Sequence, residues 1–396
     1  MNSRRFFVTL AVALGLLNGC GGGSISLPPE PVSFPVGRTT IEWTDSSRSN
    51  QCPGAQERSA RKLQAYVWYP ATPSADAVKS PVFDAVQAGI LSQMYGISAQ
   101  ILAAIPSGSR VNASMSKAWD SHPVLIMSHG AGGGFPLLYS STAESLASAG
   151  YIVVGMSHPH HSLTTFFNNG DVAMLEPRCD PMGATPQLGP GSTFEQYTAN
   201  WNYQVLLSQY LTADIKSAIA HLRALNTSHP LFAGRLELDR VGVWGHSFGG
   251  SHAFASLLEI PQVVAAANID GTVFSNQYAS GVHHGKALLT LLGGDNVHAE
   301  HQERTRIAAL RQLGLSEAEA TEVARRGQPY FIHNASTNSV LARLPQAKHM
   351  NFTDLGLWAR YGVPVDPDTV APSHVDSVLA SQRRLLLQFF GEHLQP

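Results

Sequence analysis

Charge of either sign is scarce in this sequence. Its 396 residues carry a formal net charge of −2, and only 14% of them are charged. Without a positive field or a basic stripe the chain has no general attraction for nucleic acid, so we expect no nucleic-acid partner. No repeat at a fixed period is present, which argues against a repeat architecture. Hydrophobic residues make up 44%, enough for one large α/β domain with insertions.

Long hydrophobic runs are also missing. The longest early run, Phe6 to Leu17, is too short to span a bilayer and follows the basic pair Arg4 and Arg5, as in a secretory signal. Its end, Leu17-Asn18-Gly19-Cys20, resembles a bacterial lipobox, in which cleavage leaves a lipidated cysteine at the new N-terminus. The alternative is a plain signal peptide with a chance cysteine.

The chain therefore divides into three predicted parts. Residues 1–19 are expected to be the signal peptide, and residues 20–35 the lipidated Cys20 with a flexible Gly/Pro-rich linker. Residues 36–396 are expected to form a single catalytic domain with excursions near 160–205 and 297–338. We expect an exported protein that is lipid-anchored to the cell envelope. In a Gram-negative source the anchor would be periplasm-facing or in the outer membrane, and Gly21 after the cysteine, in place of Asp, favours the outer membrane.

Cysteine is rare, and its scarcity limits the metal sites that can be built. Cys20 set aside, Cys52 and Cys179 remain as an even pair in an oxidising compartment, either bonded to each other or both free. No cysteine pair supports a zinc site beside the histidine groups, His158, His160 and His161, and His298 and His301. We interpret these histidines as solvated or pocket-lining, and we expect neither a metal nor a cofactor.

Short apolar runs alternate with helix-like segments along the mature chain. This order predicts an α/β fold with a mostly parallel central sheet and helices on both faces. The expected buried strands are 123–127, 151–156, 241–244, 263–269 and 288–292, with an early, half-exposed strand at 63–69. Ile215, Ile219, Leu222 and Leu225 mark the apolar face of a helix, and Ser316 with Glu319 has the spacing of a capping box.

The strongest chemical signal is Gly245-His246-Ser247-Phe248-Gly249-Gly250. It contains G-x-S-x-G, the nucleophile elbow of the α/β-hydrolase fold, between a buried strand and a helix-compatible stretch. The flanking glycines are required because side chains would clash in so tight a turn. Ser247 is therefore the candidate nucleophile.

A second signal lies at the end of an upstream strand, in Ser128-His129-Gly130-Ala131-Gly132-Gly133-Gly134. Acyl transfer develops negative charge on the carbonyl oxygen, which backbone N–H groups stabilise. We expect the amides of Ala131 and Phe248 to form this oxyanion hole. A phosphate-binding loop is the alternative, but the segment lacks both the G-K-S/T ending and the G-x-G-x-x-G spacing.

A serine nucleophile needs a histidine base, which in this fold follows the acid in the chain. His349 is the best candidate, since it lies in a turn-like stretch after the apolar segment 340–344. Two acids compete for the third position. Asp270 ends the strand after the elbow, and Asp295 follows the next strand, where most proteins of this fold place their acid.

These motifs resemble the plasma-type (isoform II) platelet-activating factor acetylhydrolases and their bacterial relatives. The resemblance is carried by Ser128-His129-Gly130, by the elbow, by Asp270, and by His349 followed by Asn351-Phe352. In that family the acid lies 23 residues after the serine, which is the spacing of Asp270 from Ser247. The resemblance therefore implies a triad of Ser247, Asp270 and His349, with Asp295 as the alternative acid.

The motifs and the resemblance together predict a serine ester hydrolase that works through an acyl-enzyme. The resemblance implies phospholipids with short or oxidised acyl chains, or other small esters, as substrates, and the lipid anchor adds the membrane as a partner. The oligomeric state stays open. The alternatives are a dienelactone-type hydrolase, a peptidase, or a catalytically dead, lipid-anchored binding protein.

Overall fold

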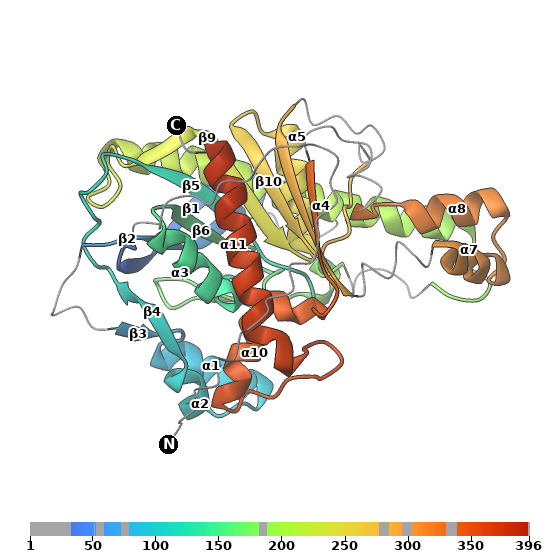
Figure 1. Ribbon diagram of the computed structural model, residues 1–396, viewed down its shortest axis with the longest axis horizontal. Helices are drawn as coiled ribbons and strands as arrows, with labels where there is room; N and C mark the ends of the chain where they lie inside the picture. The colour runs from blue at the N-terminus through green and yellow to red at the C-terminus, as the bar shows by residue number, and fades with distance from the viewer. Residues whose placement is uncertain are drawn as a thin grey trace, which may run out of the picture. The chain divides into compact units, whose positions relative to one another are not determined.

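A computed structural model describes residues 33–50, 52, 59–72, 79–181, 188–276, 285–294, 303–329 and 339–394. Ten strands of the described residues form one sheet in the order β12-β11-β10-β9-β5-β6-β2-β1-β4-β3 (Figure 1). The strands are β1 (Val36–Ser49), β2 (Ala60–Pro70), β3 (Lys79–Pro81), β4 (Pro106–Val111), β5 (His122–Ser128), β6 (Ile152–Ser157), β9 (Leu236–His246), β10 (Val263–Ile269), β11 (Ala287–Gly293) and β12 (Ser339–Leu344). A separate hairpin joins β7 (Thr164–Phe166) to β8 (Val172–Met174).

Six neighbouring strands of the sheet, β6, β5, β9, β10, β11 and β12, run parallel to one another. β2 is antiparallel to β6 on one side and to β1 on the other. In a parallel sheet the carboxyl ends of all strands meet at one edge, where the connecting loops can gather functional side chains. The predicted α/β class with a mostly parallel sheet is confirmed.

Helices cover both faces of this sheet, as its parallel connections require. The α-helices are α1 (Ala85–Tyr95), α2 (Ala99–Ala104), α3 (Ser140–Ser148), α4 (Phe194–Ser228), α5 (Phe248–Glu259), α7 (Glu303–Gln312), α8 (Glu317–Arg325), α10 (Leu355–Trp358) and α11 (Val375–Leu394). Short 3-10 helices are η1 (Pro136–Tyr139), η2 (Pro177–Cys179), η4 (His349–Phe352), η5 (Ala359–Tyr361) and η6 (Pro372–His374).

The two faces of the sheet have separate apolar cores because successive side chains of a strand point to opposite faces. On β5, Leu125 and Met127 join the core beneath α3 and α11, while Val124 and Ile126 join the core beneath α4 and α5. Figure 1 shows α3 and α11 crossing in front of the sheet. All four of these strand residues are fully buried.

The predicted strands all occur, and two predicted details differ from the structure. The run 63–69 lies within β2 and is almost wholly buried instead of half-exposed, because β2 pairs on both sides and is covered on both faces. The helix carrying Ile215 begins at Phe194, inside the predicted excursion, with Thr193 and Gln196 forming a capping box. The capping box at Ser316 is confirmed, since its side chain accepts a hydrogen bond from the amide of Glu319.

Cys52 and Cys179 form a disulfide, as one of the two sequence alternatives predicted, with their Cα atoms 5.4 Å apart. The bond ties the segment between β1 and β2 to η2, across 127 positions of sequence. Both sulfurs lie in a small apolar cluster with Phe248, and Ala131 packs against that cluster. The disulfide therefore supports the two residues predicted to form the oxyanion hole.

Several predictions fall outside the described residues. They concern the signal peptide, Cys20 and most of the linker, as well as Asp295, His298 and His301. The division of the chain into signal, linker and domain stays a prediction. Within the described ranges, no helix combines the length and apolar character needed to cross a membrane.

Candidate active site

Ser247 lies in a sharp turn between the last residue of β9 and the first residue of α5. Its backbone has φ 57° and ψ −124°, a strained conformation that non-glycine residues rarely adopt outside functional sites. Neighbouring glycines are needed because the turn is crowded. A Cβ atom on Gly245 would lie 2.1 Å from the carbonyl oxygen of Gly249, and one on Gly249 would lie 2.1 Å from that of Ser128.

The glycine-rich loop after β5 lies against this turn. A Cβ atom on Gly130 would be 3.0 Å from Ser247 Cβ and 3.5 Å from Ser247 Oγ, so a larger residue would press on the serine side chain. Phe248 is the first residue of α5, and the amide of a first helical residue has no carbonyl partner within its helix. The glycine-rich loop and the start of α5 thus both adjoin Ser247.

Asp270 and His349 are brought together from the ends of β10 and β12. His349 Nδ1 lies 2.7 Å from Asp270 Oδ2, and the amide of Gly293 donates to Asp270 Oδ1 at 2.6 Å. The side chain of Asp270 is 1% exposed and that of His349 is 37% exposed. A buried carboxylate thus orients an imidazole that solvent can reach. The amide of Ser247 donates to the carbonyl of Ile269, which fixes the elbow to the strand that carries the acid.

The turn carrying His349 is held by Asn351, which is fully buried. Its Oδ1 accepts from the amides of Lys348 and Ala371, both at 2.9 Å, and its Nδ2 donates to the carbonyl of Ala371 at 3.0 Å. One amide side chain therefore satisfies backbone groups before and after the histidine, which explains why an asparagine stands two residues beyond it.

His246 is a member of the site that the sequence did not identify as one. Its Nε2 donates to the carbonyl of His349 at 2.9 Å, so its Nδ1 accepts from the hydroxyl of Tyr139 at 3.0 Å. Tyr139 in turn accepts from the amide of Gly130 at 3.3 Å. Burial lowers the pKa of His246 to about 3, which keeps the ring neutral and this direction of hydrogen bonding fixed. One chain of contacts thus links the His349 turn to the glycine-rich loop.

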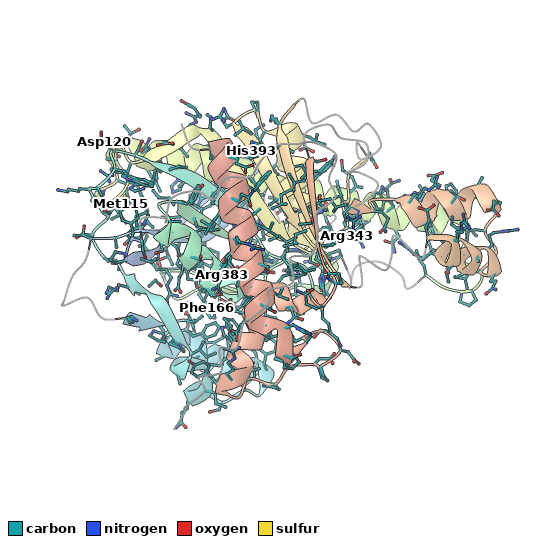
Figure 2. The ribbon with its side chains drawn as sticks, in the orientation of Figure 1. Met115, Asp120, Phe166, Arg343, Arg383 and His393 are labelled. Carbon is teal, nitrogen blue, oxygen red and sulfur yellow. A yellow bond between two sulfur atoms is a disulfide. The ribbon has the colours of Figure 1, made fainter. Side chains whose placement is uncertain are left out.

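Asp354 anchors the far end of the His349 segment to α3. It accepts from the amide of Ser141 at 2.8 Å and also from the Ser141 hydroxyl. Arg383, labelled on α11 in Figure 2, donates to that same hydroxyl at 2.6 Å. Burial raises the pKa of Asp354 to about 7 despite the hydrogen bonds from Ser141 and the nearby charge of Arg383.

The substitution Asp354→Asn is expected to change how stability depends on pH. A carboxyl group whose pKa is raised on folding stabilises the folded state fully at pH values below its unfolded pKa, near 4. That contribution is lost as the pH rises toward about 7. The unfolding free energy of the variant relative to wild type should therefore increase by about 3 kcal/mol from pH 4.5 to pH 8. Urea unfolding at both pH values measures it.

The exposed carboxylate of Asp376 on α11 offers a matched control for this measurement, because its side chain is 75% exposed. Its ion pair with Arg360 is exposed as well, so Asp376→Asn measures the loss of a carboxylate that folding does not bury. A difference between Asp354→Asn and wild type that is the same at both pH values would contradict a buried carboxyl group with a raised pKa at this position.

The predicted site residues that lie within the described ranges therefore converge at the carboxyl edge of the sheet. Ser247, Asp270, His349, Ala131 and Phe248 gather there, and Asp295 lies outside the described residues. His158, expected to line the pocket or face solvent, is instead fully buried. No group of three or more His, Cys, Asp or Glu side chains within the described ranges could hold a metal ion.

The arrangement of sheet, elbow and loops is that of the α/β-hydrolase fold. A ferulic acid esterase from Streptomyces cinnamoneus has a similar solved structure, with a TM-score of 0.60, 22% identity and coverage of 92% of both chains. At that level of identity the likeness concerns the fold alone.

Sequence comparison finds similarity to platelet-activating factor acetylhydrolases, the same family that the sequence motifs resemble. Residues 67–180 match the family described as platelet-activating factor acetylhydrolase, isoform II. A protein of Arthroderma benhamiae named "Probable 1-alkyl-2-acetylglycerophosphocholine esterase" is 28% identical over 275 residues, or 65% of this chain and 62% of that protein. The platelet-activating factor acetylhydrolase of Cavia porcellus is 28% identical over 36% of this chain and 33% of its own length. The chain thus matches less than two thirds of either curated relative.

Proposed function

We propose that the protein is a serine ester hydrolase in which Ser247 is the nucleophile, His349 the general base and Asp270 the residue that orients it. The observation that carries the proposal is the hydrogen bond of 2.7 Å between His349 and the buried Asp270, beside a serine held at φ 57°. The order serine, acid, histidine along the chain is that of this fold. The esterases and acetylhydrolases among the similar proteins support the same reaction class.

The direction of proton transfer follows from the contact with Asp270. Its carboxylate accepts the Nδ1 proton of His349, which leaves a lone pair on Nε2. This lone pair removes the hydroxyl proton of Ser247 as its oxygen attacks the carbonyl carbon of the ester. The imidazolium then gives the proton to the leaving alcohol, and an acyl-enzyme remains on Ser247. His349 next activates a water molecule, whose attack releases the acid and restores the serine.

The amides of Ala131 and Phe248 are proposed to stabilise the oxyanion of each tetrahedral intermediate. Gly130 lies against Ser247, and Ala131 packs against the cluster that contains Phe248, so both amides belong to segments beside the nucleophile. Fixed backbone donors need no reorganisation when charge develops, and losing one such donor typically costs about 10²–10³ in rate.

The substrate class is proposed from the relatives, one named as an esterase of 1-alkyl-2-acetylglycerophosphocholine and another as a platelet-activating factor acetylhydrolase. We propose small esters and phospholipids with short or oxidised acyl chains. A panel of phospholipids and p-nitrophenyl esters graded by acyl length tests this class. Turnover should be greatest for acetyl to butanoyl groups and fall with longer chains. Faster cleavage of long-chain esters would contradict the proposed class.

We also propose that the mature protein begins at Cys20 and is anchored to the cell envelope through lipid on that residue. The support is the ending Leu17-Asn18-Gly19-Cys20 after a charged and apolar leader. Mass spectrometry of the membrane fraction should find a diacylglyceryl-modified Cys20, and Cys20→Ser should release the protein from that fraction. A soluble mature protein that begins elsewhere would contradict this proposal.

A further inference from the structure

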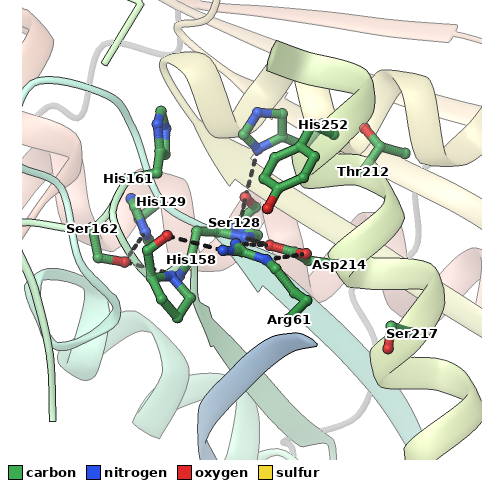
Figure 3. A network of polar contacts seen from close by, with 12 residues as sticks. Arg61, Ser128, His129, His158, His161, Ser162, Thr212, Asp214, Ser217 and His252 are labelled. Carbon is green, nitrogen blue, oxygen red and sulfur yellow. Dashed lines mark hydrogen bonds and ion pairs between the residues drawn. The ribbon is translucent and has the colours of Figure 1, made fainter. Parts of the chain in front are cut away.

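A second series of carboxylate, histidine and serine lies beneath the candidate site and is wholly buried. Asp214 Oδ2 is 2.8 Å from His158 Nδ1, and His158 Nε2 is 2.9 Å from Ser128 Oγ (Figure 3). All three residues have 0% exposure, so no substrate can reach Ser128. We call Asp214, His158 and Ser128 the buried series.

Hydrogen bonding in the buried series has a single direction. The Asp214 carboxylate accepts the Nδ1 proton of His158, so His158 Nε2 accepts the hydroxyl proton of Ser128. Ser128 Oγ is then free to accept from His252 Nδ1, which lies 2.7 Å away. Although burial opposes ionisation, Arg61 and His158 hold the pKa of Asp214 far below its usual range. Burial also lowers the pKa of His158, which favours the neutral imidazole.

Two arginines fix the acidic end of the buried series. Arg61 contacts both oxygens of Asp214, at 2.6 and 3.1 Å, and Arg48 Nη2 lies 2.8 Å from Oδ1. Arg61 also donates to the carbonyl of Pro159, the residue after His158, at 3.1 Å. Isolated buried charges are costly, so pairing with both arginines strongly favours this placement of the carboxylate.

The other end of the buried series is Ser128, at the end of β5. The loop from His129 to Gly134, which carries the proposed oxyanion donor Ala131 and which we call the oxyanion loop, begins directly after it. Ser128 is the last residue of β5 and directly precedes His129 and Gly130. The carbonyl oxygens of Ser128 and His129 lie 2.1 and 2.7 Å from where a Gly249 Cβ would be. The backbone held by the Ser128 side chain thus rests on the first turn of α5, the turn that presents the amide of Phe248.

A second set of contacts holds the loop from His129 to Gly134. These contacts come from the residues that follow His158 in the chain. Ser162 Oγ accepts from the amide of His158 at 2.8 Å and lies 2.7 Å from His129 Nε2. The amide of Leu163 donates to the carbonyl of Gly134 at 3.0 Å. Both ends of the loop from His129 to Gly134 are therefore tied to the segment that Asp214 and Arg61 hold.

We propose that Asp214, His158 and Ser128 are positioning residues for the oxyanion hole, an inference that rests on the ester hydrolysis proposed above. The buried series does not touch substrate. It transmits the fixed position of Asp214 on α4 to the backbone of the oxyanion loop, so that the amide of Ala131 stays aligned with that of Phe248. Small displacements of aligned catalytic groups are costly, about 10²-fold for a shift near 1 Å.

The test compares Ser128→Ala with Ser109→Ala. Both serines are fully buried and hydrogen-bonded through their hydroxyls, but Ser109 lies on β4 and contacts Ser107. Ser128→Ala is expected to lower kcat about 10- to 100-fold with KM changed less than about twofold, since the oxyanion hole acts in the transition state. The rate of labelling by a fluorophosphonate should fall by the same factor, because its phosphoryl oxygen occupies the oxyanion position. Thermal stability should fall as it does in Ser109→Ala.

Ser162→Ala is a second variant, which keeps the inference testable if Ser128→Ala does not fold. It removes the hydroxyl that links His158 to His129, and we expect the same loss of kcat at constant KM. If kcat and the labelling rate of the folded variants match those of Ser109→Ala, the positioning role is wrong. Ester turnover by the wild type in that same experiment would leave the proposed function standing, whereas its absence would overturn both.

Discussion

Replacing Ser247 with alanine is expected to lower kcat for ester substrates about 10⁴- to 10⁶-fold. The variant loses the atom that attacks the carbonyl, and only the oxyanion donors and substrate binding remain. Steady-state kinetics on a short-chain p-nitrophenyl ester measures the effect. The far-UV spectrum should match wild type, because alanine keeps the Cβ that already occupies this turn.

The melting temperature of Ser247→Ala provides a second test that does not depend on the kinetics. Ser247 holds φ 57° whether or not it carries a hydroxyl, so the backbone strain stays and the melting temperature should shift little. Ser109→Ala controls for the loss of a serine hydroxyl far from the site. Retention of more than about a tenth of the wild-type kcat by Ser247→Ala would show that another group is the nucleophile.

Asp270→Asn is expected to lower kcat about 10³- to 10⁴-fold. The amide of Gly293 donates to Asp270 Oδ1 at 2.6 Å, so the oxygen of an asparagine would take that position. Its NH₂ group would then face His349 Nδ1, which would have to accept a hydrogen bond instead of donating one. The imidazole proton would move to Nε2, where it blocks removal of the proton from Ser247.

Asp295→Asn is the comparison that separates the two acids considered in the sequence. The same kinetic assay on both variants decides between them. We expect Asp295→Asn to stay within about threefold of wild type, because Asp270 already supplies the contact with His349. A crippled Asp295→Asn beside an active Asp270→Asn would reverse the assignment of the triad acid.

Local patterns predicted the elements that carry the site. The run 263–269 coincides with β10, and Asp270 stands at its end because the apolar stretch stops there. The elbow could be predicted because Gly245 and Gly249 lie between a buried strand and a helix. A turn at that place is too crowded for side chains, so it requires glycine at both positions. The spacing of Asp270 from Ser247 came from family resemblance, not from physical reasoning about the residues.

The buried series could not be predicted from local patterns, because its contacts join distant parts of the chain. Arg61 and Asp214 meet across 153 positions of sequence. One signal was nevertheless present. Asp214 lies three residues after Leu211 and four before Ala218, both buried on the apolar face of α4. A carboxylate in the middle of such a face needs a buried cationic partner, which nothing in the sequence identifies.

The direct test of the account is to locate the covalent adduct of a fluorophosphonate by peptide mass spectrometry of the inhibited protein. The account predicts one adduct, on the peptide containing Ser247, with ester turnover lost in proportion to labelling and no adduct in Ser247→Ala. An adduct on a different residue that tracks the loss of turnover, or full turnover after Ser247 is completely labelled, would contradict it.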